Sequence, residues 1–114
     1  MFIVTAIVSA VLAALLVFSA VGKLRKDAAQ VKVMETVGFP LDKLWLLAAS
    51  ELAGDVGLVV GLFWWPIGVA AAVGVILYFV GAVVAHVRVR DNPTNAVVML
   101  AVAIAVLILR LVTI

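Results

Sequence analysis

Four long apolar runs dominate the 114-residue sequence and limit its fold more than any other feature. A helix that crosses a lipid bilayer needs about 20 consecutive, mostly apolar residues. Runs of that kind, which hold two acids, one histidine and one arginine between them, are residues 1–22, 44–63, 67–86 and 95–114. We therefore predict an all-α integral membrane four-helix bundle, with residues 1–114 as a single transmembrane domain.

The composition excludes several other classes of protein. The chain is 68% hydrophobic and 12% charged, whereas soluble domains carry about 25% charged residues. A soluble monomer, a disordered chain and a nucleic-acid-binding domain are therefore excluded, although the net charge is +2. The sequence has no cysteine, so disulfides, thiolate metal sites and dithiol redox chemistry on this chain are excluded as well.

Basic residues gather in two of the segments between the apolar runs. Five lie in residues 23–43 and two in residues 88–93, whereas the turn at residues 64–66 holds none. Because cytoplasmic loops carry the excess of lysine and arginine, we expect both charged segments in the cytoplasm and both termini outside. The first run lacks a basic leading region and is longer than a typical signal-peptide core, so we expect it to remain as a helix.

The first charged segment has a helical pattern of its own. Its apolar positions at helical spacing are Leu24, Ala28, Val31 and Met34. This pattern predicts a short amphipathic interfacial helix on the inner membrane surface, ended by Gly38 and Pro40. Its basic side chains suit attraction to anionic lipid headgroups, and a docking surface for a cytoplasmic partner is the alternative.

Two acidic residues lie inside the second run. Glu51 and Asp55 are four residues apart and share a helix face. They lie about 10 and 16 Å from the start of the run, at a rise of about 1.5 Å per residue. A charge at such depth costs about 2.5–3.5 kcal/mol on insertion scales, so each acid calls for a partner or a function. Because nearby carboxylates repel in a dry site, at least one should be protonated, and we predict a candidate acid–base pair.

Two other side chains are candidates to support that pair. Lys23 ends a polar stripe on the first run and either snorkels outward or reaches back to Glu51. Tyr78 lies about 13 Å from the inner end of the third run, near the depth of Asp55. A hydrogen bond between Tyr78 and Asp55 is one hypothesis, and a core tyrosine bonded to a backbone carbonyl is the alternative.

The remaining polar residues of the runs have simpler interpretations. Gly54, Gly57 and Gly61 form a stripe about 100° around the helix from the acids, which favours close approach of another helix. His86, at the inner border, is typical of a solvated helix end rather than a ligand. Arg110 is expected to snorkel toward the outer headgroups or to pair with the terminal carboxylate.

Three motifs resemble the DoxX and DoxX-like membrane proteins. They are Phe18–Leu24, which ends in Gly-Lys-Leu, the glycine-rich Glu51–Leu58 followed by Gly61-Leu62, and Ala85–Asp91. The resemblance covers nearly the whole chain and implies a multi-pass four-helix protein of the bacterial inner membrane. The positions that match are Gly22, Lys23, Glu51, Gly54, Gly57 and His86. The resemblance attaches no catalytic role to any of them.

The resemblance also guides the functional hypotheses. Some relatives are linked to thiosulfate–quinone oxidoreduction or to complexes that handle thiol stress, which favours an accessory or anchor subunit of a membrane redox system. Its partners would be the bilayer and a cytoplasmic or membrane redox protein, in a homo-oligomer or a larger complex. No cofactor or metal motif is present in the sequence, and quinone is the cofactor that the resemblance suggests.

Two alternatives follow from the buried acids. One is a small intramembrane enzyme or binding protein for an apolar molecule, with Glu51 and Asp55 as an acid–base pair supported by Tyr78 or Lys23. The other is an oligomeric proton-coupled transporter, since one four-helix unit has little room for an alternating-access pathway.

Overall fold

The fold is described from the computed structural model over residues 2–113. Met1 and Ile114, which the first and last predicted runs include, lie outside the described residues. The elements in chain order are α1 (Phe2–Leu24), α2 (Ala28–Val37), the 3-10 turn η1 (Leu41–Lys43), α3 (Leu44–Val60), α4 (Trp65–Arg88) and α5 (Thr94–Val112). The prediction of an all-α chain is confirmed.

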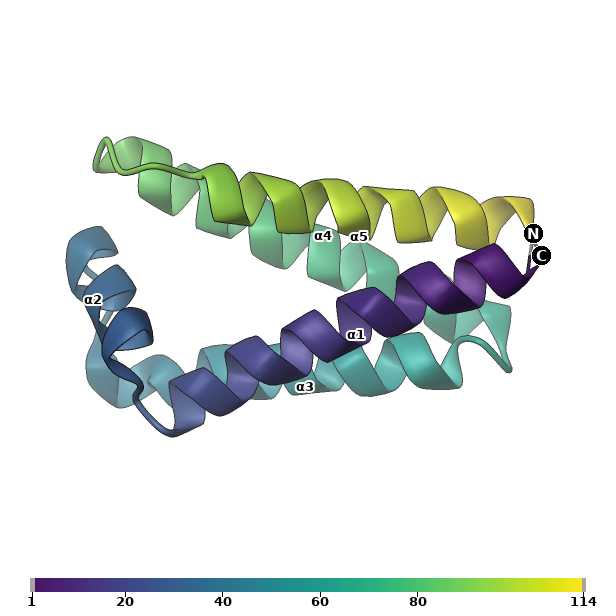
Figure 1. The fold of residues 1–114 in the computed structure, drawn as a ribbon, viewed down its shortest axis with the longest axis horizontal. Helices are drawn as coiled ribbons and strands as arrows, with labels where there is room; N and C mark the ends of the chain where they lie inside the picture. The colour runs from purple at the N-terminus through teal and green to yellow at the C-terminus, as the bar shows by residue number, and fades with distance from the viewer. Residues whose placement is uncertain (1, 114) are drawn as a thin grey trace.

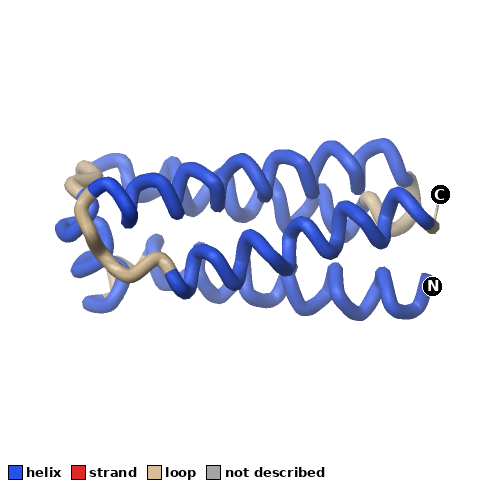
Figure 2. Tube along the Cα trace, turned by 90° about the horizontal axis from the view of Figure 1, so that it is seen from above, coloured by secondary structure: helices blue, strands red, loops and turns tan. Residues whose placement is uncertain are grey.

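The four long helices lie side by side along the 40 Å axis of the molecule (Figures 1 and 2). Helix α1 packs against α3 and α5, and α4 packs against the same two helices. The α1 and α4 helices therefore occupy diagonal positions. The short helix α2 contacts α1 and α4 at the end where α1 finishes. The described ends of α1 and α5 lie together at the opposite end (Figure 1).

An apolar core runs between the four long helices. Its buried side chains are Leu12, Leu16, Leu58, Ala72, Val75, Phe79, Met99, Ala103 and Val106. Most other large apolar side chains of these helices face outward. An exterior of this kind is what a lipid environment requires, since lipid tails are as apolar as the core.

Three of the four predicted spans meet the requirements for crossing a membrane. Helices α1, α4 and α5 are long and apolar enough to do so. The remaining predicted span, residues 44–63, is the second along the chain. It is shorter in the structure, because α3 ends at Val60 after 17 residues. Residues 61–64 form a turn instead, in which the Leu62 and Phe63 amides donate to carbonyl oxygens three residues earlier.

The helices at the α2 end of the molecule stop in the same way. Lys26, Gly38 and Arg90 have positive φ angles of 52°, 77° and 60°. Each of these residues follows the end of a helix and takes part in a Schellman motif. In this motif the amide of the residue and the amide of the next residue both donate to carbonyl oxygens of the last helical turn. The structure thus has a helix between the first two runs, α2, which is capped by Gly38. Its position at the inner membrane surface stays a prediction. The predicted third span, 67–86, ends two residues before α4 does, because the apolar run stops at His86 whereas the helix continues to Arg88.

Candidate functional site

The candidate site is built around a buried ion pair between α1 and α3. The Lys23 Nζ atom lies 2.9 Å from Glu51 Oε1, and the two side chains are 7% and 1% exposed. The ammonium approaches this oxygen outside hydrogen-bond alignment, and it donates a hydrogen bond of 2.6 Å to Ser19 Oγ instead. Of the two alternatives for Lys23, the structure supports the one in which it reaches back to Glu51.

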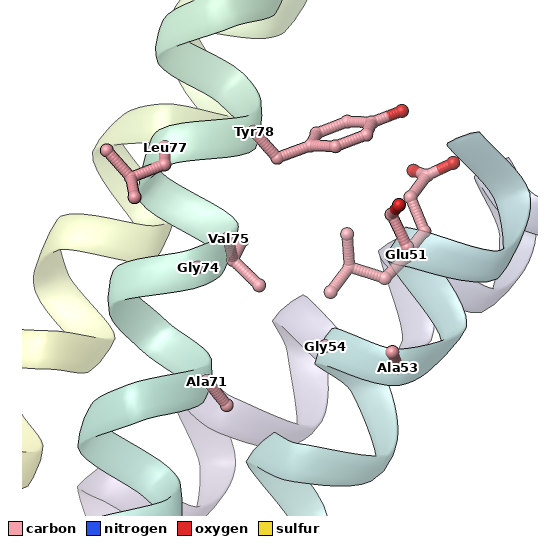
Figure 3. A pocket seen from close by; sticks show the side chains of 10 residues that line it. Glu51, Ala53, Gly54, Ala71, Gly74, Val75, Leu77 and Tyr78 are labelled. Carbon is pink, nitrogen blue, oxygen red and sulfur yellow. The ribbon is translucent and has the colours of Figure 1, made fainter. Parts of the chain in front are cut away.

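Tyr78 approaches the same carboxylate from α4. Its ring extends across the space between α4 and α3, with the hydroxyl toward Glu51 (Figure 3), and the two side chains interact. The ring also packs edge-on against Phe79 at a centroid distance of 5.1 Å. The tyrosine therefore meets Glu51 rather than Asp55, the partner suggested by depth alone.

A half-open cleft of about 630 Å³ lies beside this cluster. Its polar lining comes from Glu51, Ser50 and Tyr78, and the rest of the lining is apolar or glycine, as Figure 3 shows. Ligand pockets in proteins usually measure about 300–1,000 Å³ and combine apolar walls with a few converging polar groups. The cleft has both properties.

The size of the facing side chains determines where the cleft opens. A Cβ atom at Gly61 would overlap the backbone of Gly68, and one at Gly57 would lie 2.7 Å from the Ala71 Cβ. A Cβ atom at Gly54 would lie 2.9 Å from Cγ2 of the Val75 side chain. The helices therefore touch through their backbones near the α3–α4 turn. The cleft extends from Gly54 and Ala71 to Glu51 and Tyr78, away from that turn.

Asp55 lies in a different place from Glu51. It lines a shallow groove of about 570 Å³ with residues of α1 and with Val59. Its Oδ1 atom is covered and has no hydrogen-bond partner among the described residues. The structure therefore does not bring Glu51 and Asp55 into one pocket, and their role as an acid–base pair stays a prediction.

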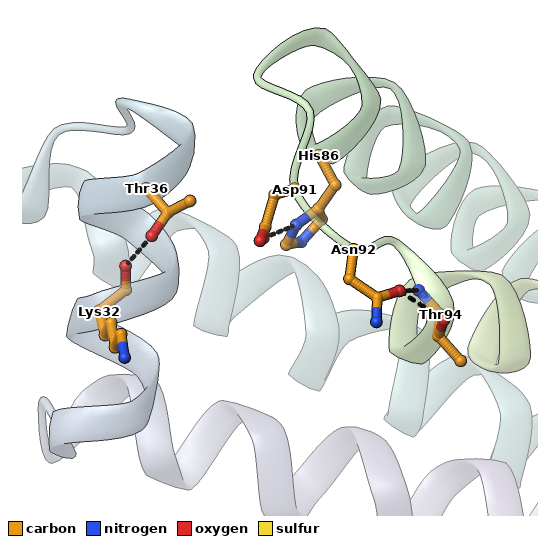
Figure 4. A network of polar contacts seen from close by, with 6 residues as sticks. All are labelled: Lys32, Thr36, His86, Asp91, Asn92 and Thr94. Atoms are coloured by element: carbon orange, nitrogen blue, oxygen red, sulfur yellow. Dashed lines mark hydrogen bonds and ion pairs between the residues drawn. The ribbon is translucent and has the colours of Figure 1, made fainter.

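His86 makes a specific contact in the α4–α5 connection. Its Nδ1 donates to Asp91 Oδ2 at 2.7 Å (Figure 4), since an ionised carboxylate only accepts hydrogen bonds. The Asp91 backbone amide donates a hydrogen bond to the His86 carbonyl oxygen. This backbone contact places the two side chains together. The hydrogen bond from His86, supported by the Asn92 backbone and the charge of Lys32, lowers the pKa of Asp91. The expected solvated histidine is thus a paired one.

Arg110 is the residue whose environment differs most from the expectation. It is 7% exposed rather than extended toward the headgroups. Its Nη1 donates to Thr113 Oγ1 at 3.1 Å, and its guanidinium lies 6.0 Å from the Phe2 ring centre. The glycine at position 68 leaves the room for it, because a Cβ there would lie 3.3 Å from Arg110 Nε. The other expected partner of Arg110, the terminal carboxylate, belongs to Ile114, which lies outside the described residues.

Sequence reasoning named Tyr78 on α4 but missed the α4 residues that face the glycine stripe. The stripe of Gly54, Gly57 and Gly61 indicated a close helix neighbour without identifying it. Its counterparts are Gly68 and Ala71 on α4. Their spacing matches the α3 stripe and could have indicated the pairing, but small residues are common throughout the third run.

The positions that resemble the family lie in three parts of the structure. Lys23 and Glu51 form the ion pair, and Gly54 and Gly57 contact α4. The third part is in the connections at the α2 end. There Gly22 lies beside Gln30 of α2, and His86 lies beside Asp91. The structure therefore gives each of these positions a definite contact.

The comparisons with known proteins identify the family. The family description that matches is "DoxX-like family", over residues 7–109. No curated protein and no solved structure matches the chain. The match contains the whole of α2, α3 and α4, most of α1 and α5, and the residues Lys23, Glu51 and Tyr78. The chain belongs to the DoxX-like family of membrane proteins.

Proposed function

We propose that this protein binds a small lipophilic molecule with a hydrogen-bonding group in the cleft between α3 and α4. The observation that carries the proposal is Glu51, whose side chain is 1% exposed and lies in the wall of a cleft that is apolar apart from Glu51, Ser50 and Tyr78. The ion pair with Lys23 holds the carboxylate in place. A ligand hydroxyl would find the carboxylate and the Tyr78 hydroxyl together, and the apolar body would fill the remaining space.

The protein would act within a four-helix transmembrane bundle that forms one domain. Helix α3 is then the fourth span, since 17 residues reach the lower limit of about 17–25 for a spanning helix. The exposed basic residues Arg25, Lys26, Lys32, Lys43, Arg88 and Arg90 favour a cytoplasmic location for the α2 end. Helix α2 would lie at that interface.

The chain's lack of cysteine allows a direct test of this orientation in the bacterial inner membrane. Single variants Phe63→Cys and Arg90→Cys place one thiol at each end of the molecule. We expect a membrane-impermeant maleimide to label Phe63→Cys on intact spheroplasts and Arg90→Cys only after lysis. The opposite labelling pattern would overturn the orientation.

Ligand binding is tested by filling the cleft without touching the ion pair. Gly74 lines the cleft, and a Cβ there meets no atom within 4 Å. Gly81 has the same open space but does not line the cleft, so Gly81→Leu is the matched control. We expect Gly74→Leu to weaken binding of 2-naphthol to the solubilised protein by about tenfold or more, equivalent to 1.4 kcal/mol. Gly81→Leu should bind as the unsubstituted protein does.

The polar part of the proposal requires a second comparison. Naphthalene has the same ring system as 2-naphthol without its hydroxyl, so it should bind more weakly to the unsubstituted protein. Glu51→Gln should reduce the preference between the two probes. Equal binding of 2-naphthol to Gly74→Leu and Gly81→Leu would contradict the proposed site.

An accessory role in a membrane redox system is the second candidate function. It is favoured by the exposed basic residues at the α2 end, which would suit an acidic surface of a partner. We expect a specific partner to co-purify after gentle extraction, and to be lost on Lys26→Glu with Lys32→Glu. Native mass spectrometry of protein from its own membrane would also detect a bound quinone. Isolation of this chain alone, with neither, would contradict this role.

Transport is less well supported by the packing. The polar stripe of α1 consists of Thr5, Ser9, Ser19 and Lys23. It is interrupted between Ser9 and Ser19 by Leu12 and Leu16, which are 0% and 1% exposed. An apolar block of this kind favours an occluded binding site over a proton path. A pH-dependent flux in liposomes would support the transporter hypothesis instead.

A further inference from the structure

The cleft between α3 and α4 has a buried inner end and an exposed outer end. Its inner end is formed by Leu16 of α1, Glu51 and Val75, all of which are buried. Its outer end is lined by exposed residues of both helices, Ser50 and Ala53 of α3 and Gly74 and Leu77 of α4. Because α3 and α4 are neighbours in the bundle, this outer end opens sideways through the bundle wall. We call these four exposed residues the lateral mouth.

The cleft is bounded by the long helices alone. Every lining residue belongs to α1, α3 or α4, and none comes from α2, η1 or the connections among the described residues. Val56 and Val73, within one turn of the mouth residues on α3 and α4, are exposed apolar side chains. In the proposed bundle, where α3 and α4 span the bilayer, the lateral mouth therefore faces lipid rather than water.

The polarity of the cleft increases from the mouth inward. At the inner side, the Tyr78 hydroxyl is directed toward the Glu51 carboxylate (Figure 3). At the mouth, the Ser50 hydroxyl donates to the Leu46 carbonyl oxygen at 2.8 Å, so its hydrogen is engaged within α3. Gly74 adds no side chain, and a Cβ there would meet no atom within 4 Å. The mouth is therefore open, and the hydrogen-bonding groups lie behind it.

We propose that the ligand is a chain-bearing amphiphile that enters from the lipid phase through the lateral mouth. Its hydroxyl head group would lie beside Glu51 and Tyr78, and its alkyl chain would pass between Ala53 and Leu77 into the bilayer. A hydroxyl group in hydrocarbon has no hydrogen-bond partner and gains one in the cleft. The chain loses nothing by staying outside, because lipid tails are as apolar as the protein core. This inference rests on the proposed function and adds the class of the ligand and its route.

Two phenols that differ only in the length of their chain test the route in lipid vesicles. The probes are 4-ethylphenol and 4-dodecylphenol, each compared at equal mole fraction in the membrane so that partitioning cancels. At the unsubstituted protein, 4-dodecylphenol should bind at least as tightly as 4-ethylphenol. Much weaker binding of the long-chain phenol would overturn the proposal, because a cleft without an open mouth excludes the chain.

A bulky residue at the mouth then separates the two probes. Ala53→Phe narrows the mouth, and Ala49→Phe is the matched control, because Ala49 is exposed one turn earlier on the same face of α3 and does not line the cleft. We expect Ala53→Phe to weaken binding of 4-dodecylphenol by about tenfold or more. Binding of 4-ethylphenol should change far less, which also shows that the variant is folded. Ala49→Phe should bind both probes as the unsubstituted protein does.

The outcomes distinguish this inference from the proposed function. Equal weakening of the two phenols in Ala53→Phe, or no weakening of either, would overturn the lateral mouth and leave the binding site in place. A complete lack of saturable binding of both phenols to the unsubstituted protein would contradict the proposed function, and this inference with it.

Discussion

The two ends of the α3–α4 interface differ in what holds the helices together. Near the turn, Gly61 and Gly68 bring the two backbones into contact. Toward the α2 end, Glu51 and Tyr78 face each other across a cleft (Figure 3). Each step of three or four residues along α3 is matched by a similar step along α4, so the two ends belong to one continuous register.

The difference shows how side-chain size can create a site between two helices. Glycine at the close end fixes the position of α4 through van der Waals contact. Larger residues at the other end separate the helices, and the separation admits both a polar cluster and a cleft. The close end supplies rigidity, and the open end supplies polar groups whose arrangement depends on that rigidity.

Breaking the ion pair should disturb the open end most. Glu51→Leu leaves the Lys23 ammonium buried without its counter-charge, and we expect a loss of about 3–5 kcal/mol in the free energy of unfolding. The double variant Lys23→Met with Glu51→Leu should recover most of that loss, because both charges are removed. Unfolding by sodium dodecyl sulfate in mixed micelles measures both. A double variant as unstable as the single one would show that packing, not charge, is responsible.

Substitution at the close end should have the next largest effect. Gly61→Ala adds a Cβ that meets the Gly68 backbone, and overpacking of this kind costs about 1–3 kcal/mol. Gly81→Ala is the matched control, because a Cβ there meets nothing and alanine favours helix. The same unfolding titration compares the two. A loss of stability as large in Gly81→Ala would mean that helix contact at Gly61 is not the cause.

Removal of the tyrosine hydroxyl should have a smaller effect on the open end. Tyr78→Phe keeps the ring and its contact with Phe79 but loses the interaction with Glu51. We expect a loss of about 0.5–1.5 kcal/mol, the usual net value of one hydrogen bond. In a Glu51→Gln background the loss should be smaller, and a double-mutant cycle measures the coupling. Additive losses would indicate that the hydroxyl acts independently of Glu51.

The smallest effect is expected at the partly buried His86–Asp91 pair. Because the folded-state pKa of Asp91 is lowered, the pair stabilises the fold above the ordinary aspartate pKa of about 3.9. That stabilisation is lost as the pH falls through the folded-state value. Asp91→Asn should remove this part of the acid dependence of thermal unfolding, with Asp42→Asn as the exposed control. Identical acid profiles for Asp91→Asn and the unsubstituted protein would contradict this assignment.

The sequence by itself determined the helical class and most of the helix positions. Long apolar runs leave few alternatives, because every backbone polar group in hydrocarbon must be satisfied within a helix or a closed barrel. It also indicated Glu51 and Lys23 as polar groups in need of partners, and Gly38 as a helix end. The helix ends at Lys26 and Arg90 could not be predicted, since tertiary context rather than residue preference holds them in the left-handed region.

Only the tertiary structure decided which buried groups meet. Glu51 and Asp55 share a helix face at four-residue spacing, yet one points to the cleft beside Tyr78 and the other to the groove beside α1. A small rotation of α3 chooses between these arrangements. That rotation depends on the contacts of Gly57 and Gly61 with α4. Helical periodicity gives the angle between two residues on one helix, whereas packing against neighbouring helices gives each residue its partner.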